Sequence, residues 1–418
     1  MNIKDRILLG REERAKIINE YLKEFKTVVS VKANFPGDNK NSYISYLLIN
    51  AFSFLISDSR FIRYHLYQNY DGPFVICLSN DLDTLKIKKL MIEIEENHEL
   101  GRYIDIDVYS IKGIMSRKTK RKCIVCEEDA FKCIINRKHS IEEVSSVIKN
   151  AVHNYYTKFL KDALKKSFLG ELRLEPKFGL VTPTSSGSHS DMNYDLMVKA
   201  IDIIIPYFID MFFESCIGID ETSIVSNINL IGKMAETDMF RVTKGINAYK
   251  GAIFNLGLAI SGIGYKISRF YKRSIFEITK RFSEILFVDY KYDSNSFGDI
   301  AYREYGLRGI RGEALSGFLN VQKALKILKG YSEESLLETL VYLIVSIDDT
   351  TFLKRAKSLD FYFKVKEMFS NLNLRDFNQV HNLNDFCIKK GLSFGGSADL
   401  LIMSIFISRM NKYCLNLI

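Results

Sequence analysis

Apolar side chains recur at helix-like spacing through most of residues 193–412, and strand-like alternation is hard to find there. Positions three and four residues apart share one face of an α-helix, so this spacing predicts helices that each bury one side. The segments with this spacing are 193–214, 223–242, 251–288, 314–328, 334–347, 360–371 and 398–412. The later part of the chain is therefore predicted to form an all-α domain.

The first third of the chain mixes short alternating segments with helical ones. Residues 27–35 alternate like a strand and stop at the turn pair Pro36-Gly37. We expect further strands at 73–79 and 101–117, and helices at 9–25, 42–56 and 82–97. This mixture predicts an α/β (α+β) domain.

The length of 418 residues predicts more than one domain, because a single core of that size is uncommon. A helix is expected to begin at Ser140, since Glu142 and Glu143 occupy its first turn. No linker rich in Pro, Gly or Ser precedes Gly170. The two domains are therefore expected to share or abut a continuous helix.

The charge balance bears on the choice of partner. The net charge is +9, and the first 150 residues carry +4 of it, with 25 Lys and Arg against 21 Asp and Glu. This even distribution of charge is at least as consistent with binding of small polyphosphate ligands as with a nucleic-acid-binding arm. We therefore expect nucleotides as ligands and no nucleic-acid partner.

Cysteine usage and the distribution of apolar residues indicate a cellular compartment. Seven cysteines, an odd number in a long chain, do not resemble a secreted disulfide framework. The N-terminus carries charges where a signal peptide needs an apolar core. The uncharged stretch 251–265 has about fifteen residues, short of the roughly twenty that a membrane span requires. A cytoplasmic, reduced protein without a membrane partner is expected.

Two acidic residues, Asp105 and Asp107, stand one residue apart in the expected strand 101–117. Strand side chains alternate, so both carboxylates face the same way, next to Arg102. Such a pair can hold Mg²⁺ against a phosphate chain. The alternative is a solvated strand face with an ion pair.

The spacing Cys123-x2-Cys126-x6-Cys133-x5-His139 follows, among several basic residues. Three thiolates and one imidazole can bind Zn²⁺ tetrahedrally. The alternative is three half-buried thiols and a histidine that faces phosphate.

The runs GRYIDIDVYS and RKCIVCEEDAFKCIINRKHS, with GREERA near the start, resemble the citrate lyase holo-acyl-carrier-protein synthase family. Its members are also described as phosphoribosyl-dephospho-CoA transferases. The resemblance covers residues 7–150 and implies a nucleotidyltransferase-type domain. It also implies that a serine of the citrate lyase acyl carrier protein attacks a triphosphate and that pyrophosphate leaves.

The segment 236–257 joins Glu236, Asn247 and Lys250 to closely spaced glycines inside an apolar frame. Such glycines let the backbone approach a ligand, and a lysine beside them is a point charge for phosphate. Similar polar segments lie at 176–191, 306–317, 348–355 and 395–399.

The ordered motifs EPKFGLVTPTSSGSHSDM, TKGINAYKGAIFNLG, GLRGIRGEALSGF, DDTTFLKR and LSFGGSADLL resemble the triphosphoribosyl-dephospho-CoA synthase family. This resemblance covers about residues 155–418, so we place two domains at 1–152 and 153–418, where the two resemblances change over. It implies that the 2′-hydroxyl of 3′-dephospho-CoA attacks the ribose of ATP and that adenine leaves. The whole chain resembles a bifunctional enzyme that makes and then installs the citrate lyase prosthetic group.

Displacement at a ribosyl carbon requires a base, negative charge near the sugar, a dry pocket and cations for the phosphates. The predicted catalytic residues are Asp105, Asp107, Asp191, Glu236 and Asp349. The predicted ATP and dephospho-CoA ligands are Lys177, His189, Asn247, Lys250, Arg311, Glu313, Arg355, Gly395, Gly396, Asp399 and Arg102. Mg²⁺ is assigned to Asp105, Asp107, Asp191, Glu236, Asp349 and Asp399, with Asp348 as a further candidate. As alternatives, Asp348 and Asp399 can be helix caps, and His189 a supporting hydrogen-bond donor.

Five positions depart from the pattern of the synthase family: Phe178, where the family has proline, Ala248-Tyr249, Thr351 and Phe394. The family has a histidine where Tyr249 stands, so a histidine base beside Lys250 is absent. A tyrosine can still hydrogen-bond a ribose hydroxyl.

Two other interpretations remain open at this point. In the first, only the second domain is active, and the first domain docks the carrier protein. In the second, the chain is a non-enzymatic nucleotide- or RNA-binding protein that uses the basic segment 112–138. Aromatic side chains, which an RNA platform needs, are sparse there, with Phe131 nearly alone.

Overall fold

The computed structural model describes residues 1–55, 60–80, 83–115, 121–411, 414 and 417–418. The chain divides into two compact units. The first is mainly Met1–Phe159, and the second is mainly Leu160–Lys266 and Arg273–Asn411. The division falls inside α5 (Ile141–Leu172), so the expectation of one continuous helix through this region is confirmed.

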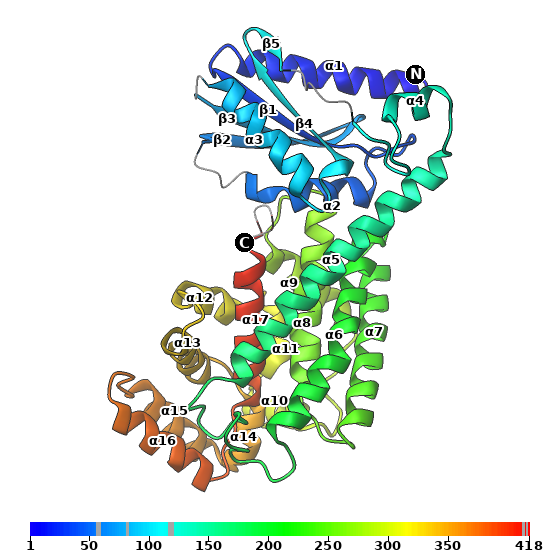
Figure 1. The fold of residues 1–418 in the computed structure, drawn as a ribbon. Helices are drawn as coiled ribbons and strands as arrows, with labels where there is room; N and C mark the ends of the chain where they lie inside the picture. Colours follow the sequence, from blue (N-terminus) through cyan, green and yellow to red (C-terminus); the bar gives the residue numbers. More distant parts are fainter. Residues whose placement is uncertain (56–59, 81–82, 116–120, 412–413, 415–416) are drawn as a thin grey trace. The chain divides into compact units, whose positions relative to one another are not determined.

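The first unit contains an antiparallel sheet of five strands in the order β2-β3-β1-β4-β5 (Figure 1). The strands are β1 (Thr27–Ala33), β2 (Arg63–Asn69), β3 (Gly72–Ser79), β4 (Ile104–Ser110) and β5 (Gly113–Ile114). The helices are α1 (Ile3–Tyr21), α2 (Tyr43–Ala51), α3 (Thr84–Asn97) and α4 (Ala130–Ile135), with 3₁₀ turns η1 (Ser53–Leu55) and η2 (Gly101–Tyr103). The unit is therefore α+β, as predicted.

One face of this sheet packs against α1. Ile18 of the helix lies in a buried cluster with Val28 of β1 and with three residues of β3. Each such side chain contributes roughly 1.5–3 kcal/mol when it is fully buried. Helices α2 and α3 lie on the opposite side of the sheet (Figure 1).

The predicted strands at 27–35 and 73–79 are confirmed as β1 and β3. The single strand expected at 101–117 was wrong, because the chain forms η2, then β4, and turns back into β5 at Gly113. Gly113 has φ +102°, a conformation that glycine adopts freely, and this allows the reversal. Residues 116–117 of that segment, and the start of the helix expected at 82–97, lie outside the described residues. Strand β2 was not predicted, since its sequence RYHLYQN is polar and aromatic without clear alternation, as suits an edge strand.

The described part of the second unit is all-helical, as predicted (Figure 1). Beyond α5 the helices are α6 (Tyr194–Ile217), α7 (Glu221–Val242), α8 (Lys250–Ile267), α9 (Ile275–Leu286), α10 (Phe297–Tyr305), α11 (Gly309–Leu315), α12 (Leu319–Ile327), α13 (Glu333–Ser346), α14 (Thr350–Ala356), α15 (Leu359–Ser370), α16 (Phe377–Lys389) and α17 (Gly395–Met410). The expected segment 251–288 is two helices, because Ser274 begins α9 with a capping box that includes Glu277.

Helix α17 lies in the core of the second unit. Every residue from Leu400 to Ile407 is buried, and the helix packs against α12, α13 and α14. A helix that is apolar on all sides must lie inside the protein. Its N-terminal residues are therefore held in the interior, where a cavity lies.

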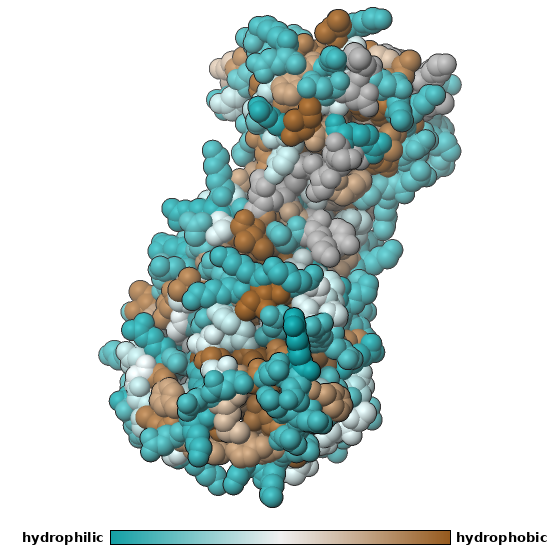
Figure 2. All heavy atoms as spheres, turned by 90° about the vertical axis from the view of Figure 1, so that its left-hand side faces the viewer, coloured by the Kyte–Doolittle hydropathy of each residue, from teal (hydrophilic) through white to brown (hydrophobic). Residues whose placement is uncertain are grey.

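Hydrophilic side chains dominate the face drawn in Figure 2, and apolar side chains show there as separate patches. Among the described helices, none has both the length and the apolar character needed to cross a membrane.

Candidate active sites

The second unit contains a cavity whose wall includes the first residues of four helices. These residues are Lys250 and Gly251 of α8, Gly309 and Ile310 of α11, Thr350 and Thr351 of α14, and Gly395 and Gly396 of α17. The first N–H groups of a helix have no partner within the helix, and the helix dipole adds partial positive charge there. Three of these starts already have side-chain acceptors, because Asn247 Oδ1 accepts from the Lys250 N–H of α8 and Asp349 accepts from N–H groups of α14 and α17. The first-turn N–H groups that these side chains leave open can hold an anionic ligand such as phosphate.

Asp349 joins two of these helix starts. Its Oδ1 accepts hydrogen bonds from the backbone N–H groups of Thr351 and Phe352, both at 3.0 Å. Its Oδ2 accepts from the backbone N–H of Ser397 at 2.9 Å and from the Ser397 hydroxyl at 3.1 Å. A carboxylate offers about four acceptor positions, and these four bonds occupy them all. Asp349 is therefore a shared cap of α14 and α17, with no acceptor position left for a metal ion.

Asp399 lies against the first turn of α8. A Cβ atom added to Gly251 would stand 2.0 Å from Asp399 Oδ2, so only glycine permits this approach. The pKa of Asp399 is raised well above its usual value, first by withdrawal from water and then by the charges of Asp349 and Glu171.

Two further acidic residues, Glu313 and Asp348, line the cavity. Glu313 Oε1 accepts a hydrogen bond from Asn320 Nδ2, whereas its buried Oε2 has no hydrogen-bond partner in the described structure. Burial raises the pKa of Glu313, and the charge of Asp348 raises it further. The free acceptor points to a cation or a donor that a ligand supplies.

Both lysines of the cavity wall are paired with carboxylates. Lys177 is 1% exposed, and its Nζ lies 2.9 Å from Glu171 Oε1. Burial lowers the pKa of Lys177, although Glu171 opposes that shift. Lys250 Nζ lies 2.9 Å from Glu236 Oε2. These lysines therefore supply little uncompensated positive charge for a triphosphate.

His189 is held as a neutral imidazole. Arg355 lies with its NH2 3.1 Å from His189 Nδ1, and since guanidinium can only donate, Nδ1 accepts. His189 Nε2 then carries the proton and donates to Ser393 Oγ at 2.9 Å. Burial and the charge of Arg355 lower the pKa of His189 to about 4. This arrangement makes His189 a fixed hydrogen-bonding group.

The structure brings most of the predicted residues of the second unit to this cavity. Those in its wall are Lys177, His189, Asn247, Lys250, Glu313, Asp348, Asp349, Gly395, Gly396 and Asp399. The wall also contains Glu171 and Tyr249, which were not predicted as site residues. Glu171 follows Gly170 in an otherwise apolar part of α5. A single carboxylate in such a place is the sequence pattern that could have identified it as a site residue.

Four predicted residues do not line this cavity. Asp191 is largely exposed, with Oδ1 3.9 Å from His189 Nδ1, and Glu236 lines a different pocket between α7 and α8. Arg355 holds the loops through the carbonyls of Ser188 and Gly391. Arg311 is paired with the buried Asp299 and stacks over Tyr290. The predicted cluster of Asp191, Glu236, Asp349 and Asp399 is therefore not gathered in one place.

In the first unit, Asp105 and Asp107 lie on β4 beside β1. The strand register places Asp105 opposite Lys32 and Asp107 opposite Ser30. Burial and the neighbouring Asp105 raise the pKa of Asp107. Arg121 pairs with Asp105 and also bonds the buried Glu95 at 2.6 Å. The two carboxylates thus form a partly buried, like-charged pair that a cation would stabilise.

The side chain of Arg102, predicted to bind a nucleotide beside Asp105 and Asp107, contacts the cysteine-containing loop instead. Its NH2 donates to the backbone carbonyl of Cys123 at 2.6 Å, and its NH1 lies 3.5 Å from Glu127 Oε1. It therefore supports the cysteine-containing loop.

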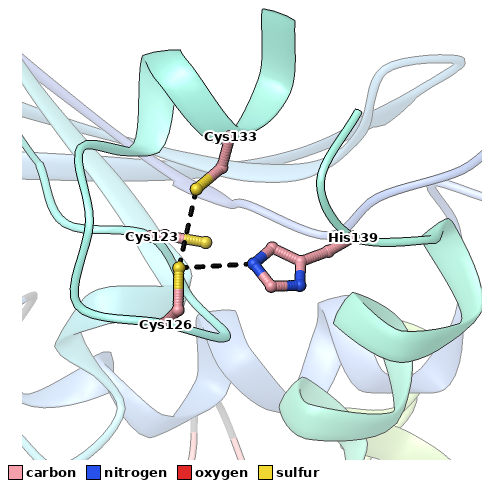
Figure 3. Close-up of side chains that lie close together, drawn as sticks. All are labelled: Cys123, Cys126, Cys133 and His139. Atoms are coloured by element: carbon pink, nitrogen blue, oxygen red, sulfur yellow. Dashed lines mark hydrogen bonds between the residues drawn. The ribbon is translucent and has the colours of Figure 1, made fainter. Parts of the chain in front are cut away.

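The four residues Cys123, Cys126, Cys133 and His139 converge (Figure 3). Their ligand atoms all lie within 4.8 Å of one another. Cys126 Sγ is 3.6 Å from Cys133 Sγ and 3.3 Å from His139 Nε2. Hydrogen bonds from neighbouring backbone and thiol groups lower the pKa of Cys123 to about 7, although its burial opposes them.

Comparison with known families gives two matches. The family model described as ATP:dephospho-CoA triphosphoribosyl transferase matches residues 157–416. The one described as apo-citrate lyase phosphoribosyl-dephospho-CoA transferase matches residues 3–155.

Curated relatives resemble the chain over its full length. Protein CitXG of Leuconostoc mesenteroides subsp. cremoris is 30% identical over 97% of this chain and 96% of its own length. Protein CitXG of Haemophilus influenzae is 29% identical over 96% of this chain and 94% of its own length. A 2-(5''-triphosphoribosyl)-3'-dephosphocoenzyme-A synthase of Haemophilus ducreyi is 31% identical over 69% of this chain and all of its own length.

These findings define a transferase composed of two family domains in one chain. The chain belongs to the ATP:dephospho-CoA triphosphoribosyl transferase family, in its fused form with the citrate lyase phosphoribosyl-dephospho-CoA transferase. It combines synthesis of triphosphoribosyl-dephospho-CoA with transfer of the prosthetic group. The matches give no support to a docking-only first domain or to an RNA-binding protein.

The contact between Gly251 and Asp399 predicts that Gly251→Ala lowers the rate of adenine release about a hundredfold, because the new methyl group displaces the carboxyl by an ångström or more. Adenine release and the far-ultraviolet circular dichroism spectrum are the measurements. Gly298→Ala is the matched control, since Gly298 is also the second residue of a helix and has no atom within 4 Å of an added Cβ. Equal rates in the two variants would contradict a role for this contact.

The low pKa of His189, about 4 against an ordinary value near 6.5, predicts acid sensitivity. Between these values the unfolded chain binds more protons than the folded one, so the free energy of unfolding falls as pH drops from about 6.5 to 4. Urea denaturation at pH 7 and pH 5 measures this loss. We expect a smaller loss in His189→Gln than in the parent protein, whereas equal losses would assign the acid sensitivity to other groups.

Proposed function

We propose that the cavity of the second unit binds ATP and 3′-dephospho-CoA and transfers the triphosphoribosyl group between them. The observation that carries this proposal is the meeting of four helix starts and five acidic residues, including Glu171 and Asp399, in one cavity wall. The helix-start N–H groups that Asn247 and Asp349 do not occupy suit phosphate oxygens. The carboxylates suit a sugar that gains positive charge as its bond to adenine breaks.

Mg²⁺ fits the cavity on chemical grounds. Acidic groups outnumber cations in the wall, and the two lysines are already paired. A triphosphate would be repelled without a metal ion, and carboxylate oxygens are the ligands that Mg²⁺ prefers. Glu313, whose Oε2 lacks a partner, and the adjacent Asp348 would hold it. When bound, Mg²⁺ neutralises phosphate charge and orients the triphosphate.

Asp399 is the proposed base of this reaction. It accepts the proton of the dephospho-CoA 2′-hydroxyl as the oxygen attacks the anomeric carbon of the ATP ribose. Because its pKa is raised, the ionised Asp399 carboxylate would be a stronger base than an exposed one. Asp349 positions the two helix starts around it, and His189 fixes Ser393 nearby.

The first unit, proposed to extend to residue 152, is of the nucleotidyltransferase type. Asp105 and Asp107 would hold Mg²⁺ against the triphosphate of the product from the second unit, since both are oxygen ligands on one sheet face. A serine hydroxyl of the citrate lyase acyl carrier protein attacks the α-phosphorus, and pyrophosphate leaves. The odd number of cysteines in this long chain, seven, supports the proposed reducing, cytoplasmic location.

The two activities are expected to separate by mutation when ATP, Mg²⁺, 3′-dephospho-CoA and apo carrier protein are supplied together. Adenine, rather than ADP, should appear in step with carrier modification in the parent protein. Asp105→Asn should keep adenine release and lose carrier modification, because only the metal ligand of the first unit changes. Asp399→Asn should lose adenine release yet still modify the carrier when purified triphosphoribosyl-dephospho-CoA is added.

Mass spectrometry of the nucleotides and of the carrier protein gives both readouts. ADP as the only nucleotide product would exclude transfer at the ribose. Loss of both activities in Asp105→Asn, with folding intact, would contradict the assignment of one activity to each unit.

We propose further that Cys123, Cys126, Cys133 and His139 bind Zn²⁺. Zinc–sulfur bonds of about 2.3 Å in a tetrahedron separate neighbouring ligand atoms by about 3.7 Å. The separations of 3.6 Å and 3.3 Å around Cys126 Sγ are near this value. Glu143 Oε2 lies 3.3 Å from His139 Nδ1, a position from which it can orient the ring. The ion would hold the loop from which Arg121 reaches Asp105.

Metal analysis of the purified chain should find about one zinc ion per molecule. Cys126→Ser should remove most of it and reduce carrier modification, because Arg121 is no longer held, while adenine release remains. Cys216→Ser is the control, since Cys216 is a buried cysteine of the second unit. A fully active protein without zinc would contradict the site.

A further inference from the structure

Three cations surround one buried carboxylate in the first unit. Asp71, in the turn between β2 and β3, has a fully buried side chain. Its Oδ1 lies 3.4 Å from Arg11 Nε, and its Oδ2 lies 2.5 Å from both Arg14 NH1 and Lys32 Nζ. The cations come from α1 and β1, so the carboxylate ties a helix and two strands together.

This cluster has more positive charge than Asp71 can balance. Lys40 also lies near, with its Nζ donating to the Phe35 carbonyl at 2.6 Å. Four cations therefore lie around Asp71, while Asp38 acts on Lys40 and Asp107 on Arg14 from outside the ion-paired cluster. Burial lowers the pKa of Lys32 and of Lys40, and neighbouring arginines lower each further. Partly buried cations in excess are costly unless an anion joins them.

The backbone around the cluster is tightly fixed. A Cβ atom added to Gly10 would stand 2.6 Å from the backbone nitrogen of Asp71. Asn69 Nδ2 donates to the Gly10 carbonyl at 2.7 Å, and Asn69 Oδ1 accepts from the Asp71 N–H at 2.9 Å. The arginines that follow Gly10 are thus set against the sheet before any ligand binds, which lowers the entropic cost of binding.

The cluster adjoins the two carboxylates of β4. Lys32 stands opposite Asp105 in the register of β1 and β4, and facing side chains in such a pair lie about 5 Å apart at Cβ. The charge of Arg14 acts on Asp107. A set of cations and a pair of potential metal ligands therefore share one face of the sheet.

We propose that Arg11, Arg14, Lys32 and Lys40 form a polyphosphate subsite that holds the β- and γ-phosphates of the triphosphate and then the pyrophosphate that leaves. In the transfer step, the serine oxygen forms a bond to the α-phosphorus, and the bond from the α-phosphorus to the bridging oxygen breaks. Pyrophosphate leaves with the electron pair, and the serine proton passes to solvent. The subsite rests on the transfer reaction proposed above, and it neutralises charge on the leaving group.

Product inhibition of the full-length protein tests the subsite. Carrier modification is measured with purified triphosphoribosyl-dephospho-CoA while inorganic pyrophosphate is varied. In Arg14→Ala, the inhibition constant for pyrophosphate should rise about tenfold or more, as expected for one lost charge-assisted contact. Arg6→Ala removes an exposed cation of the same helix that lies over the Tyr70 ring and outside the proposed subsite, so this variant should keep the parent constant. Adenine release, a property of the second unit, should be unchanged in both, and the far-ultraviolet circular dichroism spectrum and urea unfolding check that the first unit is folded.

Arg11→Ala is the second variant, because Arg11 is 55% exposed and can be removed with little effect on folding. If both variants fold and keep the parent constant, the ion pairs with Asp71 are structural only and the subsite is overturned. If the parent protein shows no carrier modification, calorimetric titration with pyrophosphate tests the subsite independently of the transfer reaction. Binding that weakens in Arg14→Ala but not in Arg6→Ala would support the subsite, and equal binding would overturn it.

Discussion

The double cap made by Asp349 is the interaction on which the cavity of the second unit depends. Where two helices begin close together in the interior, their unpaired N–H groups need acceptors. A single buried carboxylate can serve both helices. Asp349 does this for α14 and α17 with four hydrogen bonds. Gly396 permits the approach, since an added Cβ would stand 3.0 Å from the carboxylate. The positions of Asp399 on α17 and of Asp348 before α14 follow from this joint.

The two units neutralise phosphate in different ways. The second unit surrounds its cavity with helix starts and carboxylates and keeps its lysines paired, and the proposed Mg²⁺ would supply the missing positive charge. The first unit places side-chain cations in excess around Asp71, next to the two carboxylates of β4. A ribosyl carbon that becomes cationic needs negative surroundings, whereas a departing pyrophosphate needs positive ones. The electrostatic difference therefore matches the chemistry proposed for each unit.

The sequence was most informative where function depends on local spacing. Asp105 and Asp107 share a face because strands alternate, and the cysteine and histidine residues between 123 and 139 converge within one short loop and helix. The cavity of the second unit is formed by residues far apart in sequence. Their spacing along the chain does not indicate which of the acidic residues come together. Asp191 and Glu236 are acidic like Asp399, yet the fold directs them toward His189 and Lys250. Asp71 stands alone in its turn, and only the structure reveals the cations around it.

The departures from the family pattern at Phe178 and Phe394 are explained by a common aromatic cluster beneath the cavity. Both side chains are fully buried and pack edge-on against Phe369, with ring centroids 4.8 Å and 5.1 Å away. Phe178 has φ +50°, which proline, the residue of the family pattern, cannot adopt because its ring fixes φ near −65°. The loop that carries Lys177 is held here by the aromatic packing of Phe178. Tyr249 is different, because its buried hydroxyl has no hydrogen-bond partner in the described structure and lines the cavity. The two phenylalanines thus serve the core, while the tyrosine keeps a donor free for a ligand.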